Sequence, residues 1–346
     1  MSVRRDLARL RELSFAQGDG PFTTQDVRSA GVPTETVARS LAAGLVVKVG
    51  RCSYVLRELW ERADEWDRFR LRALGFGTGA RADDHLTGWS AAVVHGFPTY
   101  GSPPEAVTAI RTRPTTSGTN ANAFGRVRTG LLPLAHRWDR GRYQIVSHAY
   151  TAIDVARHST HPAALVVCDH AMRRGVGREE LSLLSGQLAT YPGIELAAWA
   201  IEHADPRAET ALESLGRLAF IEACRPAPIS NVWIADGERH WRVDHLLPDS
   251  GVVLEGDGAG KLTAATDPHR RMRDQVIRES RLRALGYEVE RYDFGIAMHH
   301  RDLLLHLAER AAARRGHRAV PTNWSMEPPA QLRDWFRRTQ EFPNSA

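Results

Sequence analysis

Residues 241–261 read WRVDHLLPDSGVVLEGDGAGK, and this stretch decides the fold expected for the C-terminal third of the chain. It contains two apolar β segments, the first reaching Asp244 and the second followed at once by Glu255 and Asp257. The segment between them is rich in turn residues, so we expect a hairpin that brings Asp244 close to Glu255. Side chains two positions apart on a strand share a face, which places Glu255 and Asp257 on the same side.

Three clustered carboxylates repel one another, and a divalent cation removes that cost. The pattern therefore predicts a centre for Mg²⁺ (or Mn²⁺), which prefers hard oxygen ligands. Such a centre lowers the pKa of a bound water and stabilises charge on a phosphoryl oxygen. The expected metal ligands are Asp244, Glu255 and Asp257, with Lys261 assisting the phosphate chemistry and Glu213 orienting a metal-bound water. The alternative is a glycine-rich turn that happens to contain acids.

The segments around this stretch alternate between helical and β patterns. We expect helices at 207–223, 268–285 and 301–315, and strands at 229–235, 240–246, 251–255 and 287–292. Arg270 and Arg273 lie one turn apart on the second of these helices, where they would contact phosphate or form a solvated face.

These motifs resemble the PD-(D/E)xK nuclease superfamily, in its Vsr-like branch. The resemblance rests on Glu213 in LES, on RVD ending at Asp244, and on EGDGAGK from Glu255 to Lys261. It implies a restriction-endonuclease-like α/β/α domain with the acids as metal ligands. The sequence departs from the family pattern where Asp257 occupies the usual lysine position, so Lys261 would have to substitute.

Residues 1–58 show three short helical segments followed by two alternating β segments around Gly50 and Arg51. This is the order of a winged helix-turn-helix, whose third helix (35–43) enters the major groove of DNA. The outer face of that helix is expected to carry Thr34, Thr36, Arg39 and Ser40. Lys48 and Arg51 would contact phosphates from the wing. The alternative is a small helical bundle with solvated charges.

The N-terminal region also resembles AbiEi-type antitoxins of type IV toxin–antitoxin systems. The matching motifs are FTTQDV (22–27), LAAGL (41–45), SAAVVHG (90–96) and TAIDVAR (151–157). The resemblance implies DNA binding through the winged helix, often for autoregulation. Between 59 and 202 we expect a mixed α/β region, with strands at 106–110 and 143–146 and helices at 85–96, 151–158 and 162–173.

Composition limits the classes of protein. The 346 residues carry a formal charge of +5 with a pI of about 9.4, which favours an anionic partner. The three cysteines form no CxxC pair, so a disulfide framework or zinc ribbon is not expected. The charged N-terminus lacks a signal-peptide core, and no apolar run is long enough to cross a bilayer, which favours a cytoplasmic, nucleoid-associated protein.

The sequence therefore predicts an α/β multidomain protein. Its parts would be a winged helix-turn-helix at 1–58, a middle α/β antitoxin-like domain at 59–202, a Vsr-like nuclease domain at 203–316 and a tail at 317–346. The predicted function is a metal-dependent DNA endonuclease of restriction or phage defence, with DNA and a toxin or restriction-system protein as partners. The alternative is a non-enzymatic AbiEi-like antitoxin or autorepressor with a degenerate nuclease fold. An RNA substrate and a homodimer stay open.

Overall fold

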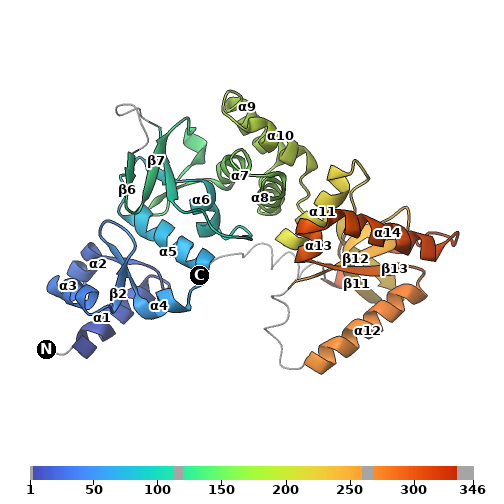
Figure 1. The fold of residues 1–346 in the computed structure, drawn as a ribbon, viewed down its shortest axis with the longest axis horizontal. Helices are drawn as coiled ribbons and strands as arrows, with labels where there is room; N and C mark the ends of the chain where they lie inside the picture. The colour runs from blue at the N-terminus through green and yellow to red at the C-terminus, as the bar shows by residue number, and fades with distance from the viewer. Residues whose placement is uncertain (1–2, 113–119, 259–267, 333–346) are drawn as a thin grey trace. The chain divides into compact units, whose positions relative to one another are not determined.

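The computed structural model describes residues 3–112, 120–258 and 268–332 (Figure 1). The chain divides into two compact units of mixed α/β structure. Unit 1 comprises Met1–Val167 and Arg174–Ile201, and unit 2 comprises Cys168–Arg173 and Glu202–Ala346. In the part of the chain that the structure describes, no helix is both long and apolar enough to span a membrane.

Unit 1 opens with three helices and a small sheet, as the sequence predicts. Thr23 ends strand β1 and caps α2, because its side chain accepts from the Asp26 amide while the Asp26 carboxylate accepts from the Thr23 amide. The three-stranded sheet has the order β1-β3-β2. The elements are α1 (Val3–Ala16), β1 (Phe22–Thr23), α2 (Thr24–Ser29), α3 (Glu35–Ala42), β2 (Val46–Lys48) and β3 (Ser53–Leu56).

The β2–β3 hairpin packs directly on the next long helix, α5 (Glu65–Thr78), which follows α4 (Arg57–Arg62). A Cβ atom on Gly50 would lie 2.0 Å from the carbonyl oxygen of Gly75, and a Cβ atom on Gly75 would lie 2.5 Å from Val49 Cγ2. Glycine is therefore needed at both positions where the hairpin meets α5. Val49, Val55 and Leu71 form one buried cluster there. The hydrophobic packing therefore continues across the predicted boundary at residue 58.

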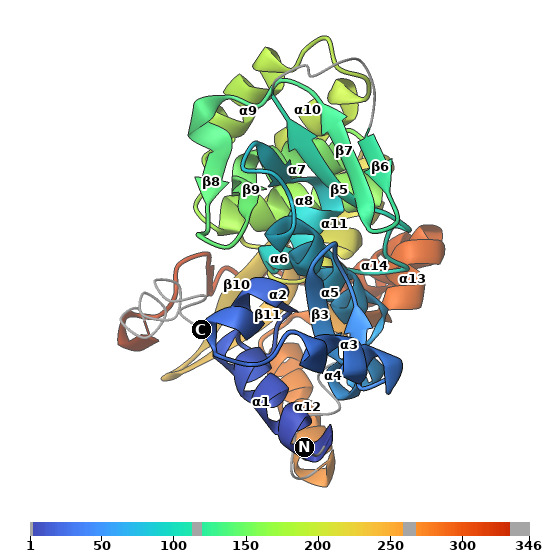
Figure 2. The ribbon, with the colours of Figure 1, turned by 90° about the vertical axis from the view of Figure 1, so that its left-hand side faces the viewer.

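A six-stranded sheet with the order β6-β7-β5-β4-β9-β8 forms the rest of unit 1, and Figure 2 shows it with α7 behind β5 and β9. The predicted helix 85–96 is wrong at its start, because residues up to Leu86 pair with β5 and β9 as strand β4. The helix begins only at Gly88, whose φ is 56°. The strands are β4 (Asp84–Leu86), β5 (Val107–Arg111), β6 (Asn120–Asn122), β7 (Gly125–Thr129), β8 (Arg137–Asp139) and β9 (Gln144–Val146). The helices are α6 (Gly88–Val94), α7 (His148–Ala156), α8 (His161–Arg173), α9 (Arg178–Gln187) and α10 (Ile194–His203), of which α8 from Cys168 and α10 from Glu202 belong to unit 2.

Unit 2 is a five-stranded sheet with the order β13-β12-β11-β10-β14. The β12–β13 pair is parallel and the other pairs are antiparallel, so the predicted hairpin of β11 and β12 is present. The predicted helix 207–223 begins later, at Ala211, because the Thr210 side chain caps it. The helices are α11 (Ala211–Glu222), α12 (Pro268–Ala284), α13 (Phe294–His299) and α14 (Arg301–Arg315). The strands are β10 (Ile229–Asp236), β11 (Arg239–Leu247), β12 (Val252–Asp257), β13 (Glu288–Asp293) and β14 (Trp324–Ser325).

Part of the predicted tail belongs to this sheet. Strand β14 pairs with β10, and Trp324 packs against the core cluster that contains Ile234 and Val243. The Asn323 side chain donates to the carbonyl of Ala235 and accepts from the Tyr287 hydroxyl. The segment before β14 is therefore held against the sheet by both backbone pairing and side-chain hydrogen bonds.

Candidate acid centre and nucleic-acid interface

The acid centre begins at an irregularity in strands β10 and β11. Val243 and Leu246 belong to the same core cluster, although residues three apart on a regular strand point to opposite faces. The alternation of side chains between the two faces of β11 is therefore interrupted between Val243 and Leu246, at Asp244 and His245. Asn231 and Asp244 lie between the register pairs Ser230–His245 and Val232–Val243, and Asn231 has a φ of 54°. Asparagine is one of the few residues that adopts this left-handed conformation readily.

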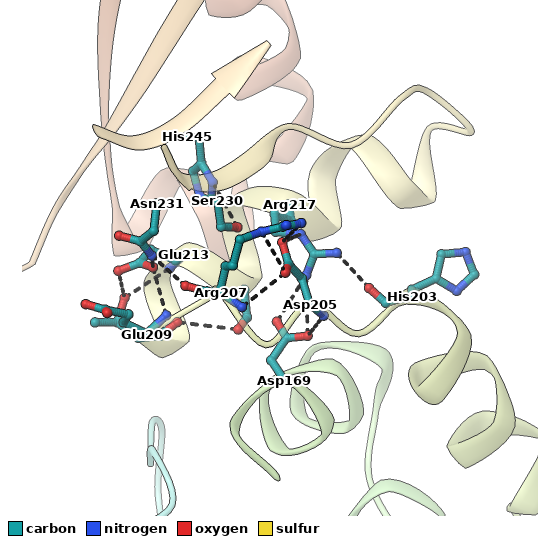
Figure 3. Close-up of polar contacts among 12 residues, drawn as sticks. Asp169, His203, Asp205, Arg207, Glu209, Glu213, Arg217, Ser230, Asn231 and His245 are labelled. Carbon is teal, nitrogen blue, oxygen red and sulfur yellow. Dashed lines mark hydrogen bonds and ion pairs between the residues drawn. The ribbon is translucent and has the colours of Figure 1, made fainter. Parts of the chain in front are cut away.

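Asn231 and Asp244 both lie close to Glu213, on the first turn of α11. The Asn231 amide donates to Glu213 Oε2 at 2.5 Å and to the Arg207 carbonyl at 2.7 Å (Figure 3). The Glu213 carboxylate also accepts from the Glu209 amide at 2.8 Å and the Thr210 hydroxyl at 3.0 Å. Burial, together with the charge of Asp244, raises the pKa of Glu213 to about 7. Two acids that the sequence predicts to cooperate are therefore neighbours.

Glu255 joins this centre through the hairpin. The Asp244 carboxylate accepts from the Gly256 amide at 2.8 Å, so it lies against the backbone that carries Glu255. The Glu255 side chain is itself buried and forms an ion pair of 2.8 Å with Arg278 of α12. Burial and then the charges of Asp244, Glu213 and Glu255 raise the pKa of Tyr292 well above its usual value. All three acids therefore lie near enough to this buried tyrosine to affect its pKa.

Asp257 is separate from these three acids in its contacts. Its carboxylate accepts from Arg291 Nε at 2.9 Å, and its side chain is 51% exposed. Lys261 lies outside the described residues. Among the residues that the structure does describe, no group of three or more His, Cys, Asp or Glu side chains is arranged to hold a metal ion. The predicted roles of these residues in metal binding and catalysis stay predictions.

Helix α11 is held to α8 and to the segment 203–205 by a buried polar network. Arg217 forms an ion pair of 3.1 Å with Asp169 and donates to the His203 carbonyl at 2.7 Å (Figure 3). Asp169 also accepts from the Asp205 amide at 2.7 Å. On the same helix, a Cβ on Gly216 would come within 2.3 Å of the Tyr292 hydroxyl, so glycine permits the close approach. These contacts fix the position of Glu213 in the centre.

Sequence reasoning assigned no role to three residues of the centre: Asn231, Arg278 and Tyr292. Asparagine is disfavoured inside strands, so its presence in a buried β segment is the signal that could have drawn attention to Asn231. The arginine gave no such signal, because α12 carries six arginines in 17 residues. Only the tertiary structure distinguishes the one that contacts Glu255.

The predicted DNA-contacting residues of α3 divide into two groups. Thr34 and Arg39 are exposed, and Arg39 donates to the Thr36 hydroxyl at 3.2 Å. Thr36 and Ser40 are 0% and 2% exposed, so their predicted place on the outer face is wrong. They lie one helical turn apart beside the buried Val37, and the inward face of the helix therefore includes both hydroxyls.

Of the other residues predicted to contact DNA, all whose side chains are described are exposed. Lys48 and Arg51 lie on and beside the β2–β3 hairpin, and the Lys48 ammonium lies 5.6 Å from the ring centre of Phe124. Arg273 of α12 is exposed, whereas the side chain of Arg270 lies outside the described residues.

Comparison with known protein families gives a match for the N-terminal part of the chain. Residues 6–56 match the family model described as "Transcriptional regulator, AbiEi antitoxin". Two uncharacterized proteins from two strains of Mycobacterium tuberculosis are each 31% identical over 172 residues, which is 47% of this chain and 62% of their own length. The crystal structure of the RV2827C protein from M. tuberculosis aligns with a TM-score of 0.33 and 13% identity, over 66% of this chain and 84% of that one. The chain carries an N-terminal domain of the AbiEi antitoxin type of transcriptional regulator.

Proposed function

We propose that this protein is a DNA-binding transcriptional regulator of the antitoxin type, with a winged helix-turn-helix as its reader. The family match over residues 6–56 carries the proposal. Helix α3 supports it, because one face packs inward through Val37 while Arg39 is exposed on the other. The β2–β3 hairpin follows α3 directly and presents Lys48 and Arg51, as a wing does beside a recognition helix.

In this proposal, α3 enters the major groove and Arg39 contacts a base edge. Arginine forms paired hydrogen bonds with guanine O6 and N7, which is the commonest specific contact in the major groove. Lys48 and Arg51 contact phosphates and set the register. An antitoxin of this kind would also bind a toxin protein as its partner.

The test is fluorescence anisotropy with duplex DNA from the region upstream of the protein's own gene. We expect wild-type protein to bind it at least tenfold more tightly than random DNA, and Arg39→Ala to remove that preference, since one bidentate arginine contributes about 1–3 kcal/mol of discrimination. Arg62→Ala, a change of an exposed arginine on α4, is the matched control. Equal affinity of the wild type for both DNAs would contradict the proposal.

A metal-dependent endonuclease is the second candidate function, favoured by one observation. Asp244 lies against the backbone that carries Glu255 and its charge acts on Glu213, and carboxylate oxygens suit Mg²⁺ or Mn²⁺. A divalent cation does not fit the centre as it stands, however, because protein donors already hold these carboxylates. The candidate is tested by incubating plasmid with the protein and Mg²⁺ or Mn²⁺. It requires cleavage that Glu255→Ala abolishes.

A further inference from the structure

Each acid on strands β11 and β12 already has a partner from the protein. Glu255 forms its ion pair with Arg278, and Asp257 forms one with Arg291. Asp244 accepts from the Gly256 amide. Like charges close together in a buried site are costly unless something neutralises them. Here arginine side chains and a backbone amide do so, which is the role that a bound cation plays in a metal centre.

Arg278 is the central residue of this arrangement. Its Nη2 atom donates to Glu255 Oε1 at 2.8 Å and also to the carbonyl of Arg242. The guanidinium therefore joins α12 to two adjacent strands. The side chain of Glu255 is only 6% exposed, whereas that of Arg278 is 28% exposed, so the ion pair lies between the buried carboxylate and the surface.

We propose that Arg278 occupies the place of a cation in the acid centre and excludes divalent metal ions from Glu255. A guanidinium in contact with the carboxylate repels a second cation and uses the oxygen that the cation would need. Metal ions can reach this carboxylate only when Arg278 leaves it. The proposal goes beyond DNA binding by the N-terminal domain, and it does not depend on nuclease activity.

The experiment measures Mn²⁺ binding to the full chain by electron paramagnetic resonance of the free ion. We expect the wild type to bind Mn²⁺ only at millimolar concentrations and Arg278→Gln to bind it at least tenfold more tightly. The double variant Glu255→Gln/Arg278→Gln should lose that gain, because the carboxylate is gone. Arg281→Gln, a change of an exposed arginine on the same helix, should behave as the wild type.

A second readout guards against misfolding of the variant. Removing Arg278 leaves the buried carboxylate without its cation, so Arg278→Gln should lower the melting temperature, and Mn²⁺ should restore it in this variant alone. If Arg278→Gln fails to fold, Arg278→Met replaces it in both measurements.

Three results would overturn the proposal. They are micromolar Mn²⁺ binding by the wild type that Glu255→Gln removes, equal binding by the wild type and the Arg278 variant, and no binding by either. Plasmid cleavage is scored separately. Mn²⁺ binding by Arg278→Gln without any cleavage would remove the nuclease candidate and leave the exclusion by Arg278 in place.

Discussion

The side-chain amide of Asn231 donates to the Glu213 carboxylate across 2.5 Å, from a backbone whose φ is 54°. This hydrogen bond joins β10 to the first turn of α11. It also lies where the side-chain alternation of β11 shifts beside Asp244. Besides the Arg217 network, a strand residue in a left-handed conformation therefore positions Glu213 in the acid centre.

Replacing Asn231 should destabilise unit 2. Asn231→Gly keeps the conformation but removes the donor to Glu213 and to the Arg207 carbonyl, with an expected loss of about 2–3 kcal/mol in the free energy of unfolding. Asn231→Ala should lose about 1 kcal/mol more, because alanine is strained at positive φ. Urea unfolding followed by tryptophan fluorescence measures both. Equal stability of the two variants would show that the conformation imposes no strain.

The contact between the hairpin and α5 should not tolerate a methyl group. Gly50→Ala would place its Cβ 2.0 Å from the Gly75 carbonyl oxygen, so we expect a loss of about 2 kcal/mol or more and weaker DNA binding. Gly79→Ala is the matched control, since its Cβ would meet its nearest neighbours at 3.6 Å or more. Thermal unfolding compares the two variants. A Gly50→Ala protein as stable as the control would contradict the close packing.

Unit 1 should lose stability in mild acid. His95 and His148 contact each other with ring centres 4.4 Å apart, and burial lowers their pKa values to about 3 and about 4. In the unfolded chain each titrates near pH 6.5. Between these values the unfolded state binds more protons, so the stability that is fully present above pH 6.5 is lost as the pH falls.

The expected loss is about 2 kcal/mol per histidine between pH 7 and pH 5. His148→Phe keeps the ring contacts with Trp138 and His95 while removing one titrating group, so its unfolding free energy should depend less on pH. His161→Phe, a change of an exposed histidine at the start of α8, should keep the wild-type slope. The measurement is urea unfolding at several pH values, and identical slopes for all three proteins would refute the prediction.

Arg51 should contribute to DNA affinity without contributing to sequence preference. If it contacts a phosphate, Arg51→Ala should weaken binding to specific and random DNA alike and reduce the slope of log K against log salt by about 1. Anisotropy titrations at four salt concentrations measure that slope, with Arg62→Ala as the control. An unchanged slope in Arg51→Ala would place this side chain away from the DNA backbone.

The sequence alone determined most of the local structure of this protein. Apolar runs mark β10 (residues 232–235) and β12 (residues 252–254), and the segment between β11 and β12 is rich in turn residues, so the hairpin and its acids were predictable. The capping side chain of Thr23 and the glycines that end short helices made α2 and α3 predictable in the same way. These signals are local, because each depends on neighbours within one turn or one strand.

The tertiary structure decided which side chains meet. The inward position of Thr36 and Ser40 depends on where α3 packs, and the helical spacing itself does not reveal it. Arg278 is 23 residues from Glu255, and nothing in the spacing of the six arginines of α12 selects it. Asn231 reaches Glu213 only because β10 lies beside the first turn of α11 in the folded protein. Contacts between distant residues depend on packing, so a fold class was predictable from this sequence while the electrostatics of its acid centre were not.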